Sequence, residues 1–391
     1  MQQDEIRDAI PPYVTLSLSD LVGCRSDLWN HYFPFNSSNG LWTFSGRVAL
    51  KEGLSRLALP AGSKILVPSY YQGSEISTLI DAKYTLEFYR LSRTLQVDLN
   101  DIEERITPDV RALYLIHYFG LPQDIGTIAA FCRDRGLALI EDCALSLLSR
   151  CGETWLGSSG DIALFSIYKS LPMPHGGYLV SKQPGPKGNL RTPPLRSTLA
   201  QSANLLAQRY LRGDKTGALM KLWSATRPWR RAVVNETVLS GQTKWSSVQF
   251  EYTTSAIARR LLKSFDPELV IARRRANFNK LHSLLAEFTE PLIQSLPDGA
   301  CPLFYPILVS DKKSFRDALS ARGIGSVNIW STHHPACPPH LAKEVDYLRN
   351  HLVELPIHQQ LNEYDMERIA AAVTSILMDE WEKQTPLQAA S

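Results

Sequence analysis

The most informative part of the sequence is LALIEDCALSLLSRCGETWLGSSGDIALFSIYKSLPMPHGGYLVS, residues 137–181. It contains three short runs rich in aliphatic and aromatic residues, at positions 137–142, 161–167 and 176–181. Runs of this length and composition are typical of buried strands. Asp142 ends the first run and Lys169 follows the second, so charged groups stand where two expected strands end.

The same pattern continues on the N-terminal side of this stretch. Further strand-like runs lie at residues 64–69, 85–91 and 111–117. Residues 124–135 have a helical pattern instead, with Ile125, Ile128, Ala129 and Cys132 on one face. Alternating strands and helices predict an α/β fold in which helices cover a mostly parallel sheet.

The C-terminal third of the chain predicts a second, smaller unit. We expect a long helix at residues 267–288, a strand at 303–310 and a helix at 313–322. Asn362 is the expected N-cap of the last helix, and Asp365 can bind backbone N–H groups at its start. The expected division is an N-terminal segment (1–40), a large domain (41–265) and a small α+β domain (266–391).

Residues 183–244 depart from this alternation. They open with the loop signal QPGPKGNLRTPP and then become helical and basic, with Asp214 and Glu236 as their only acidic residues. We interpret this segment as a solvated helical excursion of the large domain. The alternative is a patch that attracts an anionic substrate, a nucleotide or a membrane surface.

The bulk composition narrows the class of protein. With 391 residues, 44% of them hydrophobic, the chain has enough apolar material for one large or two ordinary domains. A net charge of +3 is too small to indicate nucleic-acid binding. Neither a bilayer-spanning apolar run nor a signal-peptide pattern is present, so we expect a cytoplasmic protein with no transmembrane segment. The six cysteines are scattered, which indicates reduced thiols. The sequence contains no spacing of His, Cys, Asp or Glu typical of a metal site, so we expect no metal.

Asp142 is the first candidate for a residue that binds a ligand or takes part in catalysis. It ends a run expected to be buried, at the edge of an α/β sheet where ligands bind. A buried carboxylate needs a cationic partner, and a protonated pyridine nitrogen would be one. The alternative is that Asp142 is the N-cap of a following helix.

Lys169 adds to this indication. It stands 27 positions after Asp142 (169 − 142) and shortly before Gly176-Gly177, a pair at which the backbone can approach a ligand closely. A lone lysine is otherwise expected at the surface. Removal from water lowers the pKa of a lysine, so that its neutral amine can attack an aldehyde.

A third element is Ser45-Gly46-Arg47, a turn of small residues that opens an expected helix. The free N–H groups and the dipole at a helix start favour a phosphate. Arg47 can add a charge-assisted contact or point to solvent.

In this order, these residues resemble the DegT/DnrJ/EryC1/StrS family of pyridoxal-phosphate (PLP) aminotransferases. The resemblance is carried by SGRVAL (45–50), VPS (67–69), IHYFG (116–120), IEDCA (140–144), Phe165-Ser166 with Lys169 and Gly176-Gly177, and LPIH (355–358). It covers roughly residue 40 to the C-terminus, apart from the basic segment. It implies a fold-type I PLP enzyme, with a mostly parallel sheet of the seven-stranded type in the large domain and a smaller C-terminal α+β domain.

The family's catalytic residues carry over onto this sequence position by position. The resemblance implies that Lys169 holds the cofactor as a Schiff base and that Asp142 pairs with its pyridine nitrogen. Gly46 and Arg47 would offer backbone N–H groups to the phosphate, and Ser166 a hydroxyl.

Two positions depart from the family pattern. The residue that stacks on the cofactor ring is usually aromatic, and here Gln72 stands in its place, beside Tyr71. Three residues after the aspartate the family usually has Gln or His near the phenolic oxygen, and Leu145 cannot form that hydrogen bond.

The implied activity is transfer of an amino group from a small-molecule donor, Glu or Gln, to a carbonyl acceptor such as a keto-sugar or natural-product intermediate. One alternative is another PLP-dependent reaction on the same scaffold, by a lyase, dehydratase or C–C bond-forming synthase. The other is a non-catalytic regulatory protein, against which an intact Lys169 argues.

The resemblance also implies a homodimer with shared active sites. Residues 245–262 support this expectation, because apolar and aromatic residues lie among polar ones there, as is typical of interfaces: Trp245, Phe250, Tyr252, Ile257 and Leu261.

Overall fold

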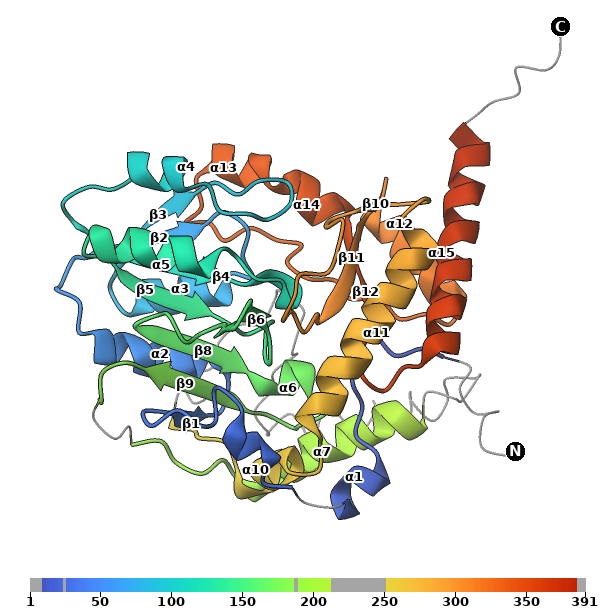
Figure 1. Ribbon diagram of the computed structural model, residues 1–391, viewed down its shortest axis with the longest axis horizontal. Coiled ribbons are helices and arrows are strands. Elements are labelled where there is room, and N and C mark those ends of the chain that lie inside the picture. Colours follow the sequence, from blue (N-terminus) through green and yellow to red (C-terminus); the bar gives the residue numbers. More distant parts are fainter. Residues whose placement is uncertain (1–8, 24–25, 186–188, 212–250, 385–391) are drawn as a thin grey trace, which may run out of the picture.

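A seven-stranded sheet forms the centre of the computed structural model, which describes residues 9–23, 26–185, 189–211 and 251–384 (Figure 1). The strand order is β1-β9-β8-β5-β4-β2-β3, and within this sheet only β9 runs opposite to the other six strands. The strands are β1 (Leu41–Thr43), β2 (Lys64–Pro68), β3 (Thr85–Tyr89), β4 (Val110–Ile116), β5 (Ala138–Asp142), β8 (Ile162–Ser166) and β9 (Gly177–Ser181). The expected mostly parallel sheet is confirmed, while the three-residue β1 is too short to stand out in the sequence.

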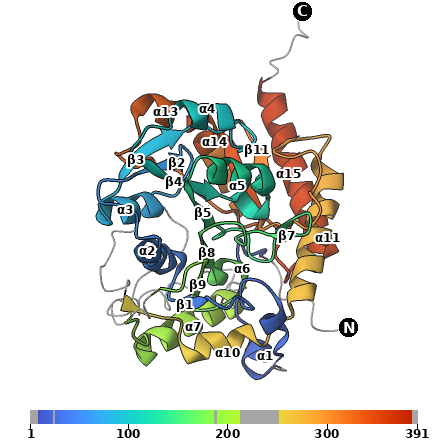
Figure 2. The same ribbon diagram turned by 60° about the vertical axis from the view of Figure 1, so that its left-hand side comes forward.

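Helices cover both faces of this sheet (Figures 1 and 2). Side chains alternate along β2, so that Ile65 and Val67 join one apolar layer and Leu66 joins the other. The first layer packs against α2 (Gly46–Leu57) and α3 (Ser74–Asp81). The second packs against α5 (Ile125–Asp134) and α10 (Ala256–Leu262). The sheet is therefore buried on both faces, as strands made of continuous apolar runs require.

Helix α7 and several shorter elements complete this part of the chain. They are α1 (Leu18–Val22), η1 (Leu28–His31), α4 (Leu99–Glu104), η2 (Tyr118–Gly120), β6 (Arg150–Cys151), β7 (Thr154–Trp155), α6 (Ile167–Ser170) and α7 (Leu195–Tyr210). Among the described helices, none has both the length and the apolar character that crossing a bilayer requires.

The C-terminal part has its own three-stranded antiparallel sheet, β10 (Glu290–Pro291), β11 (Phe304–Leu308) and β12 (Leu352–Pro356). The helices of this part are α11 (Pro267–Leu285), α12 (Lys312–Ala321), α13 (Pro339–Glu344), α14 (Asp346–His351) and α15 (Glu363–Gln384). Helices α11, α12 and α15 enclose a separate apolar cluster with β11 and β12. The exact boundaries of the expected domains stay a prediction.

The expected start of the last helix is confirmed. The Asn362 side chain accepts a hydrogen bond from the Asp365 N–H, and Asp365 accepts one from the Asn362 N–H, both at 3.0 Å. This reciprocal cap satisfies backbone groups that the helix itself leaves without a partner. Met366, Ile369 and Val373 follow on the buried face, as their spacing predicts.

The basic segment can be followed only in part, because residues 186–188 and 212–250 lie outside the described chain. Its described part is a loop followed by α7, as expected. Arg191 forms an exposed ion pair with Glu251 at 3.6 Å, and Arg209 donates to the hydroxyl of Thr15 at 3.4 Å. Arg196 lies in α7, and the remaining basic residues assigned to the segment, among them Lys215, lie outside the described residues.

Two backbones meet closely where β9 begins. A Cβ placed on Gly177 would lie 2.3 Å from the carbonyl carbon of Ser45 and 2.4 Å from its oxygen. Ser45 directly precedes α2, so glycine at this position lets β9 pass against the start of that helix. The contact fixes the start of α2 relative to the centre of the sheet.

We expect the change Gly177→Ala to lower the free energy of unfolding by about 1–3 kcal/mol, because the new methyl group overlaps backbone that cannot move freely. Gly126→Ala is the matched control. It lies in α5, where the nearest atom to an added Cβ is 3.8 Å away, and it should change stability by less than about 1 kcal/mol. Urea unfolding followed by circular dichroism measures both. Equal stability of the two variants would show that the close approach is unimportant.

Candidate active site

A pocket opens at the carboxyl ends of the parallel strands, where α/β proteins bind ligands. Asp142 ends β5 and Ser166 ends β8, while the start of α2, the loop after β2 and the turn α6 contribute the other walls. Among the residues expected at a site, the pocket is lined by Gly46, Arg47, Gln72, Asp142, Ser166 and Lys169. The fold thus brings these six residues together from five separate segments.

Tyr71 is the expected site residue that is not among those lining the pocket. Its side chain is fully buried, and its ring packs against Phe88 with centroids 5.7 Å apart. Its hydroxyl accepts a hydrogen bond from the N–H of His334 at 3.1 Å. Burial raises the pKa of Tyr71, so the phenol stays protonated. Tyr71 thus joins the loop after β2 to a C-terminal loop beside the pocket.

Asp142 has a defined and buried environment. The hydroxyl of Tyr114 donates to one carboxylate oxygen at 2.6 Å, and the N–H of Ala144 donates to the other at 2.8 Å. Burial raises the pKa of Asp142, and so does the nearby Glu75, while Tyr114 and the charge of Lys169 lower it. Turns rather than a helix follow Asp142, so it is not a helix N-cap.

Lys169 lies in α6, a single helical turn directly after β8. It lines the same pocket as Asp142, close enough for its charge to favour the ionised carboxylate. An amine and a buried carboxylate therefore face one cavity, although 26 residues separate them in the chain, which follows from their numbers (169 − 142 − 1). This is an arrangement that can hold a cationic ring and a carbonyl group together.

The start of α2 provides a site suited to an anion. The Ser45 hydroxyl is buried and has no hydrogen-bond partner, while Gly46 and Arg47 line the pocket. A Cβ on Gly46 would lie 2.5 Å from the Ser166 hydroxyl oxygen, so glycine allows Ser166 to approach the helix start. Two hydroxyls, a helix N-terminus and a guanidinium are groups that bind phosphate. The residues present therefore fit a phosphorylated pyridine cofactor.

The sequence did not identify several other residues that line the pocket, and three of them, Tyr114, Glu75 and Trp330, shape its polar and aromatic walls. Tyr114 lies on β4, two residues before Ile116, so both side chains are on the same face of the strand. The two-residue period of a strand is the feature of the sequence that could have indicated Tyr114. Glu75 accepts hydrogen bonds from the Gln72 N–H at 2.7 Å and the Ser74 hydroxyl at 3.1 Å. Trp330 comes from the C-terminal part, and no local pattern in the sequence links it to the pocket.

The two departures from the family pattern both face the pocket. Leu145 is buried in its wall, where it can offer only apolar contact. The side-chain oxygen of Gln72 shares the single proton of the Ser74 hydroxyl with Glu75, each acceptor lying 3.1 Å from the Ser74 oxygen. The wall thus presents an amide and an aliphatic group where the family usually has an aromatic ring and a hydrogen-bonding side chain.

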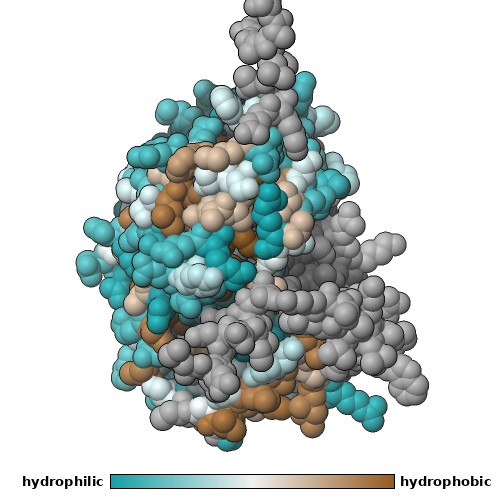
Figure 3. All heavy atoms as spheres, turned by 90° about the vertical axis from the view of Figure 1, so that its right-hand side faces the viewer, coloured by the Kyte–Doolittle hydropathy of each residue, from teal (hydrophilic) through white to brown (hydrophobic). Residues whose placement is uncertain are grey.

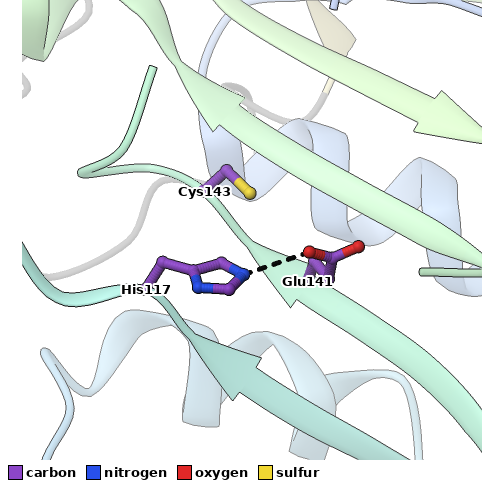
Figure 4. A group of neighbouring side chains, drawn as sticks. All are labelled: His117, Glu141 and Cys143. Carbon is purple, nitrogen blue, oxygen red and sulfur yellow. Dashed lines mark hydrogen bonds and ion pairs between the residues drawn. The ribbon is translucent and has the colours of Figure 1, made fainter. Parts of the chain in front are cut away.

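One cluster in the described part of the chain has the composition of a metal site: His117, Glu141 and Cys143 (Figure 4). The Gln123 N–H donates to Nδ1 of His117 at 3.2 Å, so Nε2 carries the proton and faces Glu141 at 3.0 Å. Glu141 also accepts hydrogen bonds from backbone N–H groups of the loop that precedes β8, at Gly157, Ser159 and Gly160. The imidazole has no lone pair left for an ion, so we interpret the cluster as a structural hydrogen-bond network.

The model of the DegT/DnrJ/EryC1/StrS aminotransferase family matches residues 35–374. Over 374 residues the chain is 25% identical to dTDP-4-dehydro-2,3,6-trideoxy-D-glucose 4-aminotransferase of Saccharopolyspora spinosa, covering 92% of this chain and 89% of that protein. It is 29% identical to GDP-perosamine synthase of Vibrio cholerae over 140 residues, 35% of this chain and 38% of the length of that protein.

A comparison of structures gives the same fold. Helicobacter pylori PseC, an aminotransferase involved in the biosynthesis of pseudoaminic acid, superimposes with a TM-score of 0.65 at 16% identity. The match covers 95% of this chain and all of that chain (100%). The α/β architecture with a mostly parallel central sheet is therefore that of the fold-type I enzymes. Since the family model spans most of the chain, this protein belongs to the DegT/DnrJ/EryC1/StrS aminotransferase family.

Proposed function

We propose that this protein is a PLP-dependent aminotransferase that passes an amino group from an amino-acid donor to a small carbonyl acceptor. The observation that carries the proposal is the single pocket lined by both Lys169 and Asp142 at the carboxyl ends of the strands. A lysine and a buried carboxylate are the two groups that a pyridoxal cofactor needs, one for its aldehyde and one for its ring nitrogen.

In this proposal the cofactor's phosphate lies at the start of α2. Gly46 and Arg47 supply backbone N–H groups, and the hydroxyl of Ser166 adds a donor. The buried Ser45 hydroxyl, which has no hydrogen-bond partner among the described residues, would be a further donor at the start of α2. Bound PLP supplies an electron sink that accepts the charge developing on the donor's α-carbon.

Each remaining role falls to a residue of this chain. The Asp142 carboxylate holds a proton on the ring nitrogen, and the Tyr114 hydroxyl keeps the carboxylate oriented through their 2.6 Å hydrogen bond. The neutral amine of Lys169 would take the proton from the donor's α-carbon. Leu145 and Trp330 provide apolar walls that exclude water from the reacting atoms.

The substrates follow from the relatives. The matched proteins include a sugar 4-aminotransferase and L-glutamine:2-deoxy-scyllo-inosose aminotransferase, so we propose Glu or Gln as donor and a keto-sugar or cyclic ketone as acceptor. Leu145 and Gln72 favour a second candidate, a different PLP-dependent reaction on the same scaffold. Mixing the holoenzyme with Glu or Gln alone separates the two, because only a transaminase converts the cofactor to its amine form.

We also propose a homodimer with shared sites in the cytoplasm. Exposed apolar side chains support association, among them Val22 and Trp381, and one face of the molecule shows apolar patches between hydrophilic ones (Figure 3). Residues 245–262 support this association with fewer side chains than the sequence indicates. Leu261 is buried in the core of its own chain, and Trp245 and Phe250 lie outside the described residues.

The proposed role of Lys169 is tested by the change Lys169→Ala. Without the amine no covalent link to PLP can form, so the visible absorption of the lysine-linked cofactor and the turnover should both disappear. Lys182→Ala, at an exposed lysine after β9, is the matched control and should keep both. Absorption spectra of the purified variants with added PLP make the measurement. A Lys169→Ala protein with the wild-type spectrum would show that another lysine holds the cofactor.

The second prediction concerns Asp142→Asn. The amide keeps the size of the side chain but cannot hold the ring nitrogen's proton by charge, so kcat should fall on the order of 100-fold or more. The variant should remain folded and retain some cofactor. Asp124→Asn, at the exposed cap of α5, is the control and should react at the wild-type rate. Equal kcat in the wild type and Asp142→Asn would mean that Asp142 only caps its turn.

The third prediction concerns assembly. Light scattering at micromolar concentration should give the mass of two chains, because each site is proposed to need residues of a neighbour. A monomer that binds PLP and is fully active would contradict shared sites.

A further inference from the structure

Arg274 of α11 is buried, and within the described part of the chain it forms no ion pair with a carboxylate. Its side chain is 2% exposed, and its hydrogen bonds all go to uncharged oxygens. Burial lowers the pKa of Arg274 to about 10, which leaves the guanidinium charged at neutral pH. Taking a cation out of water is costly, so these hydrogen bonds must offset a large desolvation penalty. The acceptors of these hydrogen bonds therefore show which parts of the chain Arg274 holds together.

One of these bonds reaches the last residue of the helical turn that carries Lys169. Nη2 of Arg274 donates to the carbonyl oxygen of Ser170 at 2.9 Å, and Nε2 of Gln359 donates to the same oxygen at 3.0 Å. Nε of Arg274 in turn donates to Oε1 of Gln359 at 2.9 Å, which fixes the amide. A carbonyl oxygen has two lone pairs, and here both are used. Two side chains thus set the orientation of the peptide between Ser170 and Leu171, one residue beyond Lys169.

The turn that carries Lys169 needs such support. Helix α6 contains only four residues, Ile167–Ser170, and a single turn does not stabilise itself. Before Lys169, the Ile167 N–H donates to the Gly176 carbonyl at 2.9 Å. After it, the contacts of Arg274 and Gln359 hold the chain. Both ends of the turn are anchored, and one anchor comes from the C-terminal part of the molecule.

The same guanidinium reaches the segment that leads into β11. Nη1 of Arg274 donates to the carbonyl oxygens of Pro302 and Leu303, each at 3.2 Å. Arg274 therefore links three pieces of backbone: its own helix α11, the segment before β11 and the turn of Lys169. The position of α11 is therefore linked by hydrogen bonds to the end of the turn that carries Lys169.

We propose that Arg274, together with Gln359, is a positioning residue for Lys169, an inference that rests on the proposed function. The pair holds the Ser170 carbonyl so that the lysine amine points at the cofactor's aldehyde. It also ties the geometry of the lysine to the position of the C-terminal part. Arg274 touches neither substrate nor cofactor in this role.

The test uses the full-length holoenzyme with PLP and the change Arg274→Lys, which keeps the charge but loses the forked geometry that reaches three carbonyls at once. Visible circular dichroism per bound cofactor reports how firmly the cofactor is oriented, and a pH titration of the visible band reports the pKa of the lysine link. We expect the dichroism to fall to about half or less, the spectral pKa to shift by about 0.5 or more, and kcat to drop on the order of 10-fold.

Two matched controls lie next to the test residues. Arg275 of the same helix also donates to carbonyls, those of Pro297 and Ala300, away from the lysine turn, so Arg275→Lys should leave dichroism and spectral pKa unchanged. Gln359→Ala removes the partner amide from a half-buried site and should produce the same spectral changes in weaker form. Gln360→Ala, which loses contacts with the Thr15 backbone, is its control.

The outcomes separate the inference from the proposed function. Spectral changes in Arg274→Lys and Gln359→Ala, but not in the two controls, support the inference. A lower unfolding temperature with wild-type dichroism and spectral pKa would overturn it, since the residues would then be only structural. If Arg274→Lys does not fold, Gln359→Ala decides by the same criterion. A wild-type protein with no lysine-linked band at all would overturn the proposed function and this inference with it.

Discussion

A single buried carboxylate at the end of a central strand is the constraint on which the site depends. Asp142 lies where five segments converge, and its two oxygens are held by Tyr114 and the backbone of Ala144. Burial and the nearby Glu75 disfavour its charge, while the hydrogen bonds from Tyr114 and Ala144 and a cation in the pocket favour it. Lys169 is one such group, and a protonated ring nitrogen is the other that the pocket is suited to receive. The apolar strands around β5 thus determine both the fold and the chemistry.

The pocket is closed by parts of the chain that are distant in sequence. Arg349 of α14 donates to the carbonyl oxygens of Trp330 at 2.6 Å and Thr332 at 2.9 Å, which holds the wall that Trp330 provides. Arg274 of α11 acts in a similar way on the turn of Lys169. Two buried arginines of the C-terminal part therefore bind backbone carbonyls of segments that shape the pocket. Guanidinium groups suit this role because several N–H donors point in one plane.

Most of the large sheet and much of the site could be predicted from the sequence. Strands buried on both faces appear as continuous apolar runs, so β2, β3, β4, β5, β8 and β9 were expected, and polar residues at their ends indicated Asp142 and Lys169. The contribution of Trp330 depends on packing between distant elements, which leaves no local pattern. The sequence predicts Tyr71 at the cofactor, whereas the pocket lining does not include it and its side chain contacts Phe88 and His334. Local spacing cannot show which of two neighbouring side chains faces a cavity.

The central claim is that Lys169 holds the cofactor opposite Asp142. It is tested most directly by adding PLP to the wild-type protein, reducing the complex with borohydride to make the link permanent, and locating the modified peptide by mass spectrometry. The account predicts that the added pyridoxyl group lies on Lys169. Attachment to a different lysine, or an active protein without any attachment, would contradict it.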